Sequence, residues 1–145
     1  MGFKAYEYFK KQEKQKKKLG KKIADNTGDF SKVRNTLLIF NATWSPMCVY
    51  TYSMWVDFAE RFSTDGLKFV EIDTRRTPEL PKSFKVNAKD GNQLPTLVMM
   101  ENNKEVLRFP PVDYEKGTLG KVLNYKEKEL IKYFDLDKRF LATNQ

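Results

Sequence analysis

The residues best suited to chemistry lie in the stretch 43–48, which reads "TWSPMC" and directly follows a short apolar run. A thiol near the start of a helix can act as a nucleophile, because the free backbone N–H groups there stabilise its thiolate. Cys48 is the only cysteine in the chain, so no internal disulfide can form. The stretch therefore offers one sulfur, Cys48, and one hydroxyl, Ser45, as reactive groups.

The composition limits what these two groups can do, because the chain contains no histidine. Histidine is the most common general base, and a serine hydroxyl needs a neighbouring base to become nucleophilic. We therefore expect Ser45 to be the N-cap of a helix whose first turn holds Pro46 and Met47, and not a nucleophile. The usual zinc sites need several cysteine and histidine ligands, so the sequence predicts neither a metal nor a cofactor.

Three roles for Cys48 remain open at this point. A packed core thiol is the favoured interpretation, because buried cysteines behave as small hydrophobic residues with raised pKa values. A monothiol role, through glutathionylation or a mixed disulfide with a partner, is the second. Ligation of a metal or cluster across a dimer is the third and the least favoured.

The surrounding sequence predicts the elements that position this stretch. Pro46 at the start and cysteine, aromatic and alanine residues at helical spacing indicate a helix over 45–62, in which Tyr50 and Trp55 are both expected to pack inward. Short apolar or alternating runs indicate strands, and "YKEKELIKYFDL" indicates an amphipathic helix that "DKRFL" extends by a turn. The expected order is strand 36–42, helix 45–62, strand 67–73, short helix or turn 77–86, strand 93–102, strand 104–110 and helix 125–136. A βαβ unit followed by a ββα unit predicts an α/β fold with a mixed sheet that helices flank on both faces.

Charge divides the chain into two parts. The net charge is +8, yet residues 1–22 alone hold nine lysines and two glutamates, so the remainder is close to neutral. We predict a lysine-rich arm over 1–28 and one folded domain over 29–145. The arm is expected to dock on a partner protein or an anionic membrane surface, through Lys10, Lys11, Lys14, Lys16, Lys17 and Lys18. Nucleic-acid binding is not expected, because no basic and aromatic stripe runs through the domain.

The element order, "ATWSPMC" at the first strand-to-helix turn and "LPT" before the third strand together resemble thioredoxin over about residues 30–135. The Ser-x-x-Cys pattern and the segments "QLPTLVMMENNKEVLRFP" and "LIKYFDLDKRF" resemble the thioredoxin-related transmembrane proteins whose motif begins with serine. The resemblance implies a thioredoxin-like fold with a cis peptide bond before Pro95. It also implies a peptide groove lined by Trp44, Met47, Leu94 and Pro95.

The same resemblance implies that the redox chemistry of the family is incomplete here. Ser45 stands at the position of the attacking cysteine, and Cys48 at the position of the resolving cysteine. The family places a buried carboxylate on the preceding strand, and the matching position is Ile39. The motif 45–48 is therefore not expected to be catalytic.

We predict that the chain is not an enzyme but a non-catalytic accessory module of a larger, membrane-associated protein assembly. The alternative is a monothiol redox protein that uses Cys48. The longest apolar runs, "LLIF" and "LVMM", are far shorter than a membrane span, so no transmembrane helix is expected in this chain. The resemblance implies the endoplasmic reticulum, and the arm also allows a mitochondrial location, so we expect membrane association at one of these two organelles.

Overall fold

The computed structural model describes residues 30–89, 91–111 and 125–144. A short 3₁₀ helix, η2 (Phe30–Lys32), precedes a four-stranded mixed sheet in the order β2-β1-β3-β4. The central strand β1 (Asn35–Asn41) runs parallel to β2 (Leu67–Asp73) and antiparallel to β3 (Thr96–Glu101). β3 forms a hairpin with β4 (Lys104–Phe109). This topology confirms the expected α/β fold with βαβ and ββα units.

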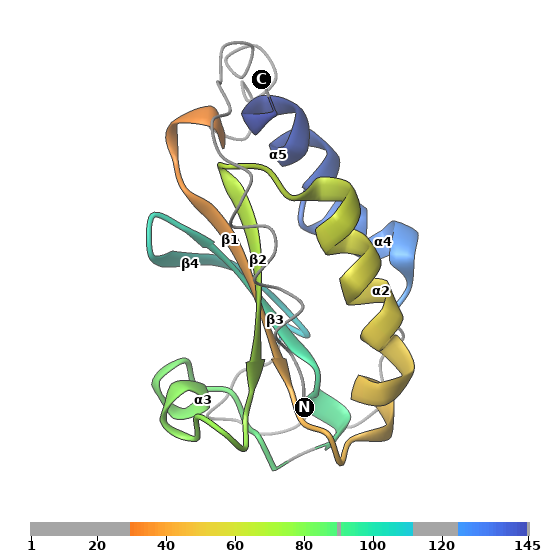
Figure 1. The fold of residues 1–145 in the computed structure, drawn as a ribbon. Coiled ribbons are helices and arrows are strands. Elements are labelled where there is room, and N and C mark those ends of the chain that lie inside the picture. Colours follow the sequence, from red (N-terminus) through yellow and green to blue (C-terminus); the bar gives the residue numbers. More distant parts are fainter. Residues whose placement is uncertain (1–29, 90, 112–124, 145) are drawn as a thin grey trace.

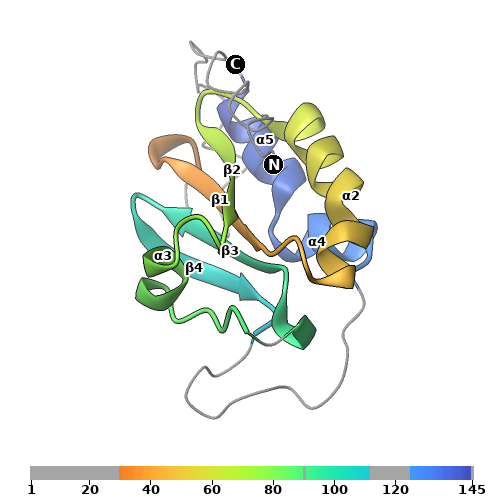
Figure 2. The ribbon, with the colours of Figure 1, turned by 60° about the horizontal axis from the view of Figure 1, so that its bottom comes forward.

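The long helix α2 (Pro46–Phe62) connects the two parallel strands and covers one face of the sheet together with α4 (Glu127–Tyr133) and α5 (Leu136–Thr143). Figure 1 shows these three helices on one side of the sheet. The short helix α3 (Glu79–Ser83) lies on the other side, beside the end of β2, as Figure 2 also shows. The helices therefore flank the sheet on both faces, as predicted.

The main core lies between the sheet and the three helices. Its centre is Trp55, which is fully buried, donates a hydrogen bond from Nε1 to Thr51 Oγ1 at 3.1 Å, and meets Phe58 and Tyr125 edge-on. A smaller cluster on the opposite face joins Phe40 to Val86 and Leu94. The expected inward positions of α2 are confirmed except for Tyr52, which is only partly buried, and Tyr50, whose side chain is 78% exposed. The prediction that Tyr50 packs in the core is wrong.

The C-terminal region contains two helices where one extended helix was predicted. α4 ends before Asp135, whose φ of 54° is left-handed and interrupts the helix. α5 then begins at Leu136 and buries Arg139, whose Nε donates to the Phe134 carbonyl at 2.8 Å. The break turns the last helix so that Arg139 reaches Asn35 and Glu101 at one end of the sheet.

The peptide bond between Leu94 and Pro95 is cis, which confirms the prediction made from the "LPT" motif. A second cis bond, between Phe109 and Pro110, was not predicted. Within the described ranges no helix has the length and apolar character that a membrane span requires.

Candidate functional site

The candidate site is the turn from β1 into α2, where the structure places the motif 45–48. Ser45 has extended backbone angles, is fully buried, and accepts a hydrogen bond on Oγ from the Cys48 N–H at 3.4 Å. Pro46 occupies the first turn, where its missing N–H leaves no helical hydrogen bond unmade. Ser45 is therefore the N-cap of α2, as predicted, and its hydroxyl is directed at the backbone.

Cys48 is a buried, free thiol one turn inside the helix, with 4% of its surface exposed. Its Sγ accepts a hydrogen bond from the Ala42 N–H at 3.4 Å. Burial is the largest influence and raises the pKa of the Cys48 thiol, while the hydrogen bonds from Ala42 and Ser45 oppose that rise. The negative charge of Glu71 raises the pKa further. A neutral, packed thiol results, and this environment is the one that the favoured interpretation of Cys48 requires.

Glu71 is the residue at this site that the sequence analysis missed. It lies on β2 directly opposite Ile39, the position at which the acid of the family pattern is absent. The Glu71 side chain is 91% buried, and its Oε2 accepts a hydrogen bond from Asn41 Nδ2. A carboxylate is thus present beside Cys48, but it comes from the neighbouring strand. The strict alternation of "LKFVEID" was the available signal, because it places Glu71 on the same face as Leu67 and Phe69.

A mostly apolar cavity of about 240 Å³ adjoins the thiol, between the first turns of α2 and the ends of β1 and β2. Asn41, Cys48, Tyr52 and Glu71 are among the residues that line it. Burial raises the pKa of Tyr52, and the charge of Glu71 adds to that rise. In the described part of the chain no three metal-binding side chains gather, here or elsewhere.

The four residues predicted to line a peptide groove lie in different environments. Trp44 is 48% exposed and Met47 is partly buried, whereas Leu94 and Pro95 are buried. Trp44 instead borders a groove of about 390 Å³ on the side of α3. Peptide binding by these residues stays a prediction. The predicted docking lysines of the arm, and the arm itself, lie outside the described residues.

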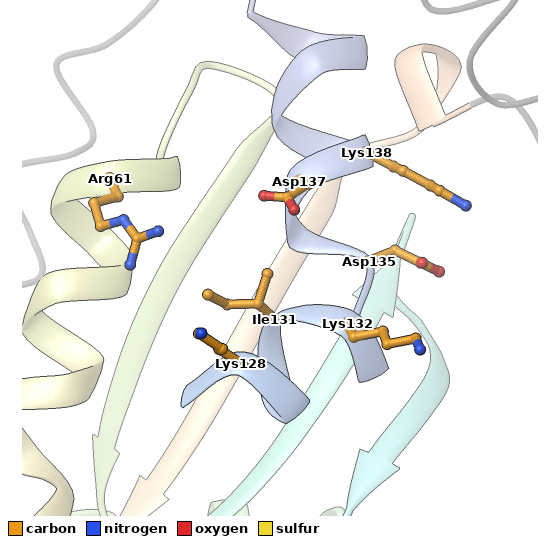
Figure 3. Close-up of a pocket in the computed structure, with 7 residues that line it drawn as sticks. All are labelled: Arg61, Lys128, Ile131, Lys132, Asp135, Asp137 and Lys138. Carbon is orange, nitrogen blue, oxygen red and sulfur yellow. The ribbon is translucent and has the colours of Figure 1, made fainter. Parts of the chain in front are cut away.

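Another hollow lies between α2 and the C-terminal helices, with a volume of about 580 Å³. Figure 3 shows Arg61 on α2 facing Ile131 and Lys128, while Lys132 and Lys138 point away from Arg61. Arg61 is already paired with Asp57 at 3.1 Å and with Glu127 at 2.8 Å. The lining mixes cations with two aspartates and does not converge on one point, so this hollow is not the candidate site. The Asp57 side chain is 46% exposed in this pair, so it lies on a solvated face of α2.

The environment of Cys48 predicts slow alkylation. Because the pKa of the thiol is raised, its thiolate fraction at pH 7 is smaller than that of a free cysteine, and burial also blocks access. We expect native protein to react with iodoacetamide at pH 7 at least about tenfold more slowly than protein unfolded in urea. The rate should still be rising with pH at the ordinary thiol pKa of 9.0, where alkylation of an exposed cysteine begins to level off. Stopped samples analysed by intact-mass spectrometry measure both rates.

Two glutamate variants test the part that Glu71 plays in this behaviour. Glu71→Gln removes one of the two influences that raise the pKa, so native alkylation should become faster than in the wild type. Glu60→Gln removes an equal charge from an exposed position of α2 and should leave the rate unchanged. Rapid alkylation of the wild-type native protein below pH 7 would contradict the assignment of Cys48 as a core thiol.

Comparison with known proteins places this geometry in context. A family model described as Thioredoxin matches residues 10–124. "Thioredoxin-related transmembrane protein 2-B" of Danio rerio is 33% identical over 102 residues, which cover 70% of this chain and 33% of that protein. The "Thioredoxin-related transmembrane protein 2 homolog" of Drosophila melanogaster is 34% identical over 86 residues, covering 59% of this chain and 31% of that protein. The chain therefore spans about a third of the length of these relatives.

Solved structures agree on the fold. Thioredoxin-2 of the malaria parasite, described as a component of its protein secretion machinery, superposes with a TM-score of 0.53 at 17% identity, over 72% of this chain and 84% of that one. Fasciola hepatica thioredoxin gives a TM-score of 0.52 at 20% identity, over 79% and 88% of the two chains. At these identities the likeness concerns the fold alone.

Proposed function

Because the chain belongs to the thioredoxin family, we propose that it is a thioredoxin-like module which has lost dithiol exchange and acts as an interaction subunit of a membrane-associated assembly. The observation that carries the proposal is Ser45, a buried N-cap hydroxyl at the position of the attacking thiol. Disulfide exchange needs an exposed thiolate to attack and a second thiol to release the mixed disulfide. The single cysteine provides neither, because its thiol is buried and has no partner sulfur.

The interaction role is supported by the surface next to the motif. Three large apolar side chains, Trp44, Val49 and Tyr50, are between 48% and 78% exposed within seven residues of sequence. Exposed apolar side chains gathered on one region mark contact surfaces more often than isolated ones do. The proposed membrane association is supported by the printed names of the relatives, which describe transmembrane proteins. The competing hypothesis, a monothiol redox protein that uses Cys48, is disfavoured by the burial and raised pKa of that thiol.

Insulin reduction tests the loss of dithiol exchange. We expect the wild-type protein to leave the rate of insulin precipitation by dithiothreitol unchanged, because no second sulfur is available to complete a cycle. Ser45→Cys places a thiol at the helix N-terminus and should give a measurable acceleration. The double variant Ser45→Cys, Cys48→Ala is the matched control and should return to background. Appreciable turnover by the wild type would refute the proposal.

The assembly is tested separately by the size of the native particle. In membranes extracted with a mild detergent, we expect the endogenous protein to migrate on a native gel far above the mass of its own chain. Migration as a monomer, with the protein recovered in the fraction that contains no membranes, would contradict the accessory role while leaving the redox result intact.

A further inference from the structure

A buried amide oxygen near Cys48 has no hydrogen-bond partner among the described residues. It is Oδ1 of Asn41, the last residue of β1, and Asn41 is only 2% exposed. Asn41 Nδ2 donates to Glu71 Oε2, and this contact fixes the amide, because only its nitrogen can donate to a carboxylate. Buried polar groups are hydrogen-bonded in the great majority of cases. A bound molecule with a donor group would satisfy this oxygen.

Asn41 and Glu71 both line the cavity of about 240 Å³ that adjoins the thiol. The rest of its lining is mostly apolar and comes from the turn before α2 and the first turns of that helix: Ala42, Thr43, Cys48, Val49 and Tyr52. An apolar cavity of about 150 Å³ is enough to hold a molecule the size of benzene. Because Val49 on the wall is 64% exposed, a ligand can enter from solvent on that side. The cavity therefore has the size and the access that a small organic ligand needs.

The charge of the lining favours a cationic donor over a neutral one. Glu71 contributes a buried carboxylate, and among the described residues no basic side chain lines the cavity. Burial raises the pKa of Cys48 and of Tyr52, and the negative charge of Glu71 adds to both rises, so that charge acts inside the cavity. Hydrogen bonds from charged donors are stronger than those from neutral donors. The same carboxylate disfavours an anion.

We propose that this cavity binds a small primary ammonium ion that carries a short apolar body. The ammonium group would donate to Asn41 Oδ1 and lie beside the Glu71 carboxylate, while the apolar body would pack against Ala42, Val49 and Tyr52. Water alone fits less well, since it would satisfy the amide oxygen but leave the apolar lining without contacts. The proposed interaction role is not needed for this inference, which goes beyond it.

Calorimetric titration of the full chain at pH 7 tests the proposal with three probes of similar size. Benzylammonium supplies a charged donor, benzyl alcohol a neutral donor, and benzoate only acceptors. We expect saturable binding of benzylammonium, about tenfold weaker binding of benzyl alcohol and no measurable binding of benzoate. Equal affinity for all three probes would overturn the proposal. Binding of none would also overturn it and would leave water as the occupant.

Removal of the Glu71 charge shows whether the probes bind in this cavity. Glu71→Gln keeps the shape of the side chain, so we expect about tenfold weaker binding of benzylammonium and a change of less than about threefold for benzyl alcohol. Glu60→Gln is the matched control, because it removes an equal charge from an exposed position of α2 about 18 Å along the helix from Cys48. At that distance the charge is screened, and both affinities should stay within about twofold of the wild type. Equal weakening in the two variants would contradict the proposal.

The role of the amide oxygen is tested by Asn41→Leu, which replaces the acceptor with an apolar group of similar size. Benzylammonium and benzyl alcohol should both bind about tenfold more weakly to this variant. Full affinity in folded Asn41→Leu protein would overturn the proposal. Circular dichroism checks the fold, and if this variant is unfolded, the three probes and the glutamate pair still decide. Insulin reduction and the size of the native particle are measured without the probes, so failure here is distinguishable from failure of the proposed function.

Discussion

Replacement of Trp55 by alanine lowers the free energy of unfolding by about 3–5 kcal/mol. The side chain is fully buried at the centre of the main core, where it meets Phe58 and Tyr125 edge-on. The substitution leaves a cavity and also removes the hydrogen bond to Thr51. A loss of this size is a large share of the roughly 5–15 kcal/mol that stabilises a typical domain. Urea denaturation followed by circular dichroism measures it.

Tyr50→Ala is the matched control for this prediction, because it removes an aromatic ring from the same helix at a position that is 78% exposed. Its effect on unfolding should stay within about 0.5 kcal/mol. Similar losses in the two variants would mean that α2 does not present the face described here to the core.

Arg139→Met is expected to lower the free energy of unfolding by about 3 kcal/mol, because removing one partner of a buried ion pair leaves the other partners unpaired. The guanidinium is 2% exposed and donates to Glu101 at 2.7 Å, to Asn35 at 2.8 Å and to the Phe134 carbonyl. It also lies 4.2 Å from the centre of the Phe30 ring. Methionine keeps much of the aliphatic volume, so the loss reports the polar network. Thermal denaturation measures it.

Arg61→Met is the control for the charge itself. Arg61 also contacts two acids, but its side chain is 46% exposed, and exposed pairs contribute about 0–1 kcal/mol. If the two arginine variants lose the same stability, the network around Arg139 is not the anchor of α5.

The sequence predicted the sheet and its long helix well, because both rest on local patterns. The run "TLLIFNA" has the length and apolar character of a buried strand, and Ser45, Pro46 and the inward stripe of α2 define a helix without reference to the rest of the chain. The "LPT" motif was enough to predict the cis bond at Pro95 through the family resemblance. These features follow from short-range spacing.

Two predictions, the burial of Tyr50 and a single C-terminal helix, were wrong because both features depend on how the helices pack in the folded chain. Tyr50 was placed inside because it is aromatic, yet it lies off the inward stripe that runs through Cys48 and Trp55. The sequence around Asp135 has no proline or glycine that would signal a helix break. Its left-handed backbone, next to the Phe134 carbonyl that accepts a hydrogen bond from Arg139, is seen only in the structure. The break between α4 and α5 could not be read from the helical pattern alone.

The candidate site was only half predictable for the same reason. Comparison of β1 with the family pattern showed that the acid is absent at Ile39. The carboxylate near Cys48, that of Glu71, comes from β2, and only the pairing of β1 with β2 places it opposite Ile39. The groove of Trp44, Arg75, Lys82 and Lys89 joins four positions that no sequence window contains. Pairing between strands and the placement of α3 create both features.

The capping of α2 by Ser45 sets the energetic consequence of introducing a thiol at this position. A substitution of cysteine at position 45 would remove the hydroxyl that accepts a hydrogen bond from the Cys48 N–H. Loss of such an N-cap typically lowers the free energy of unfolding by about 1 kcal/mol. A protein with sulfur at this position would therefore exchange some stability of the domain for redox activity.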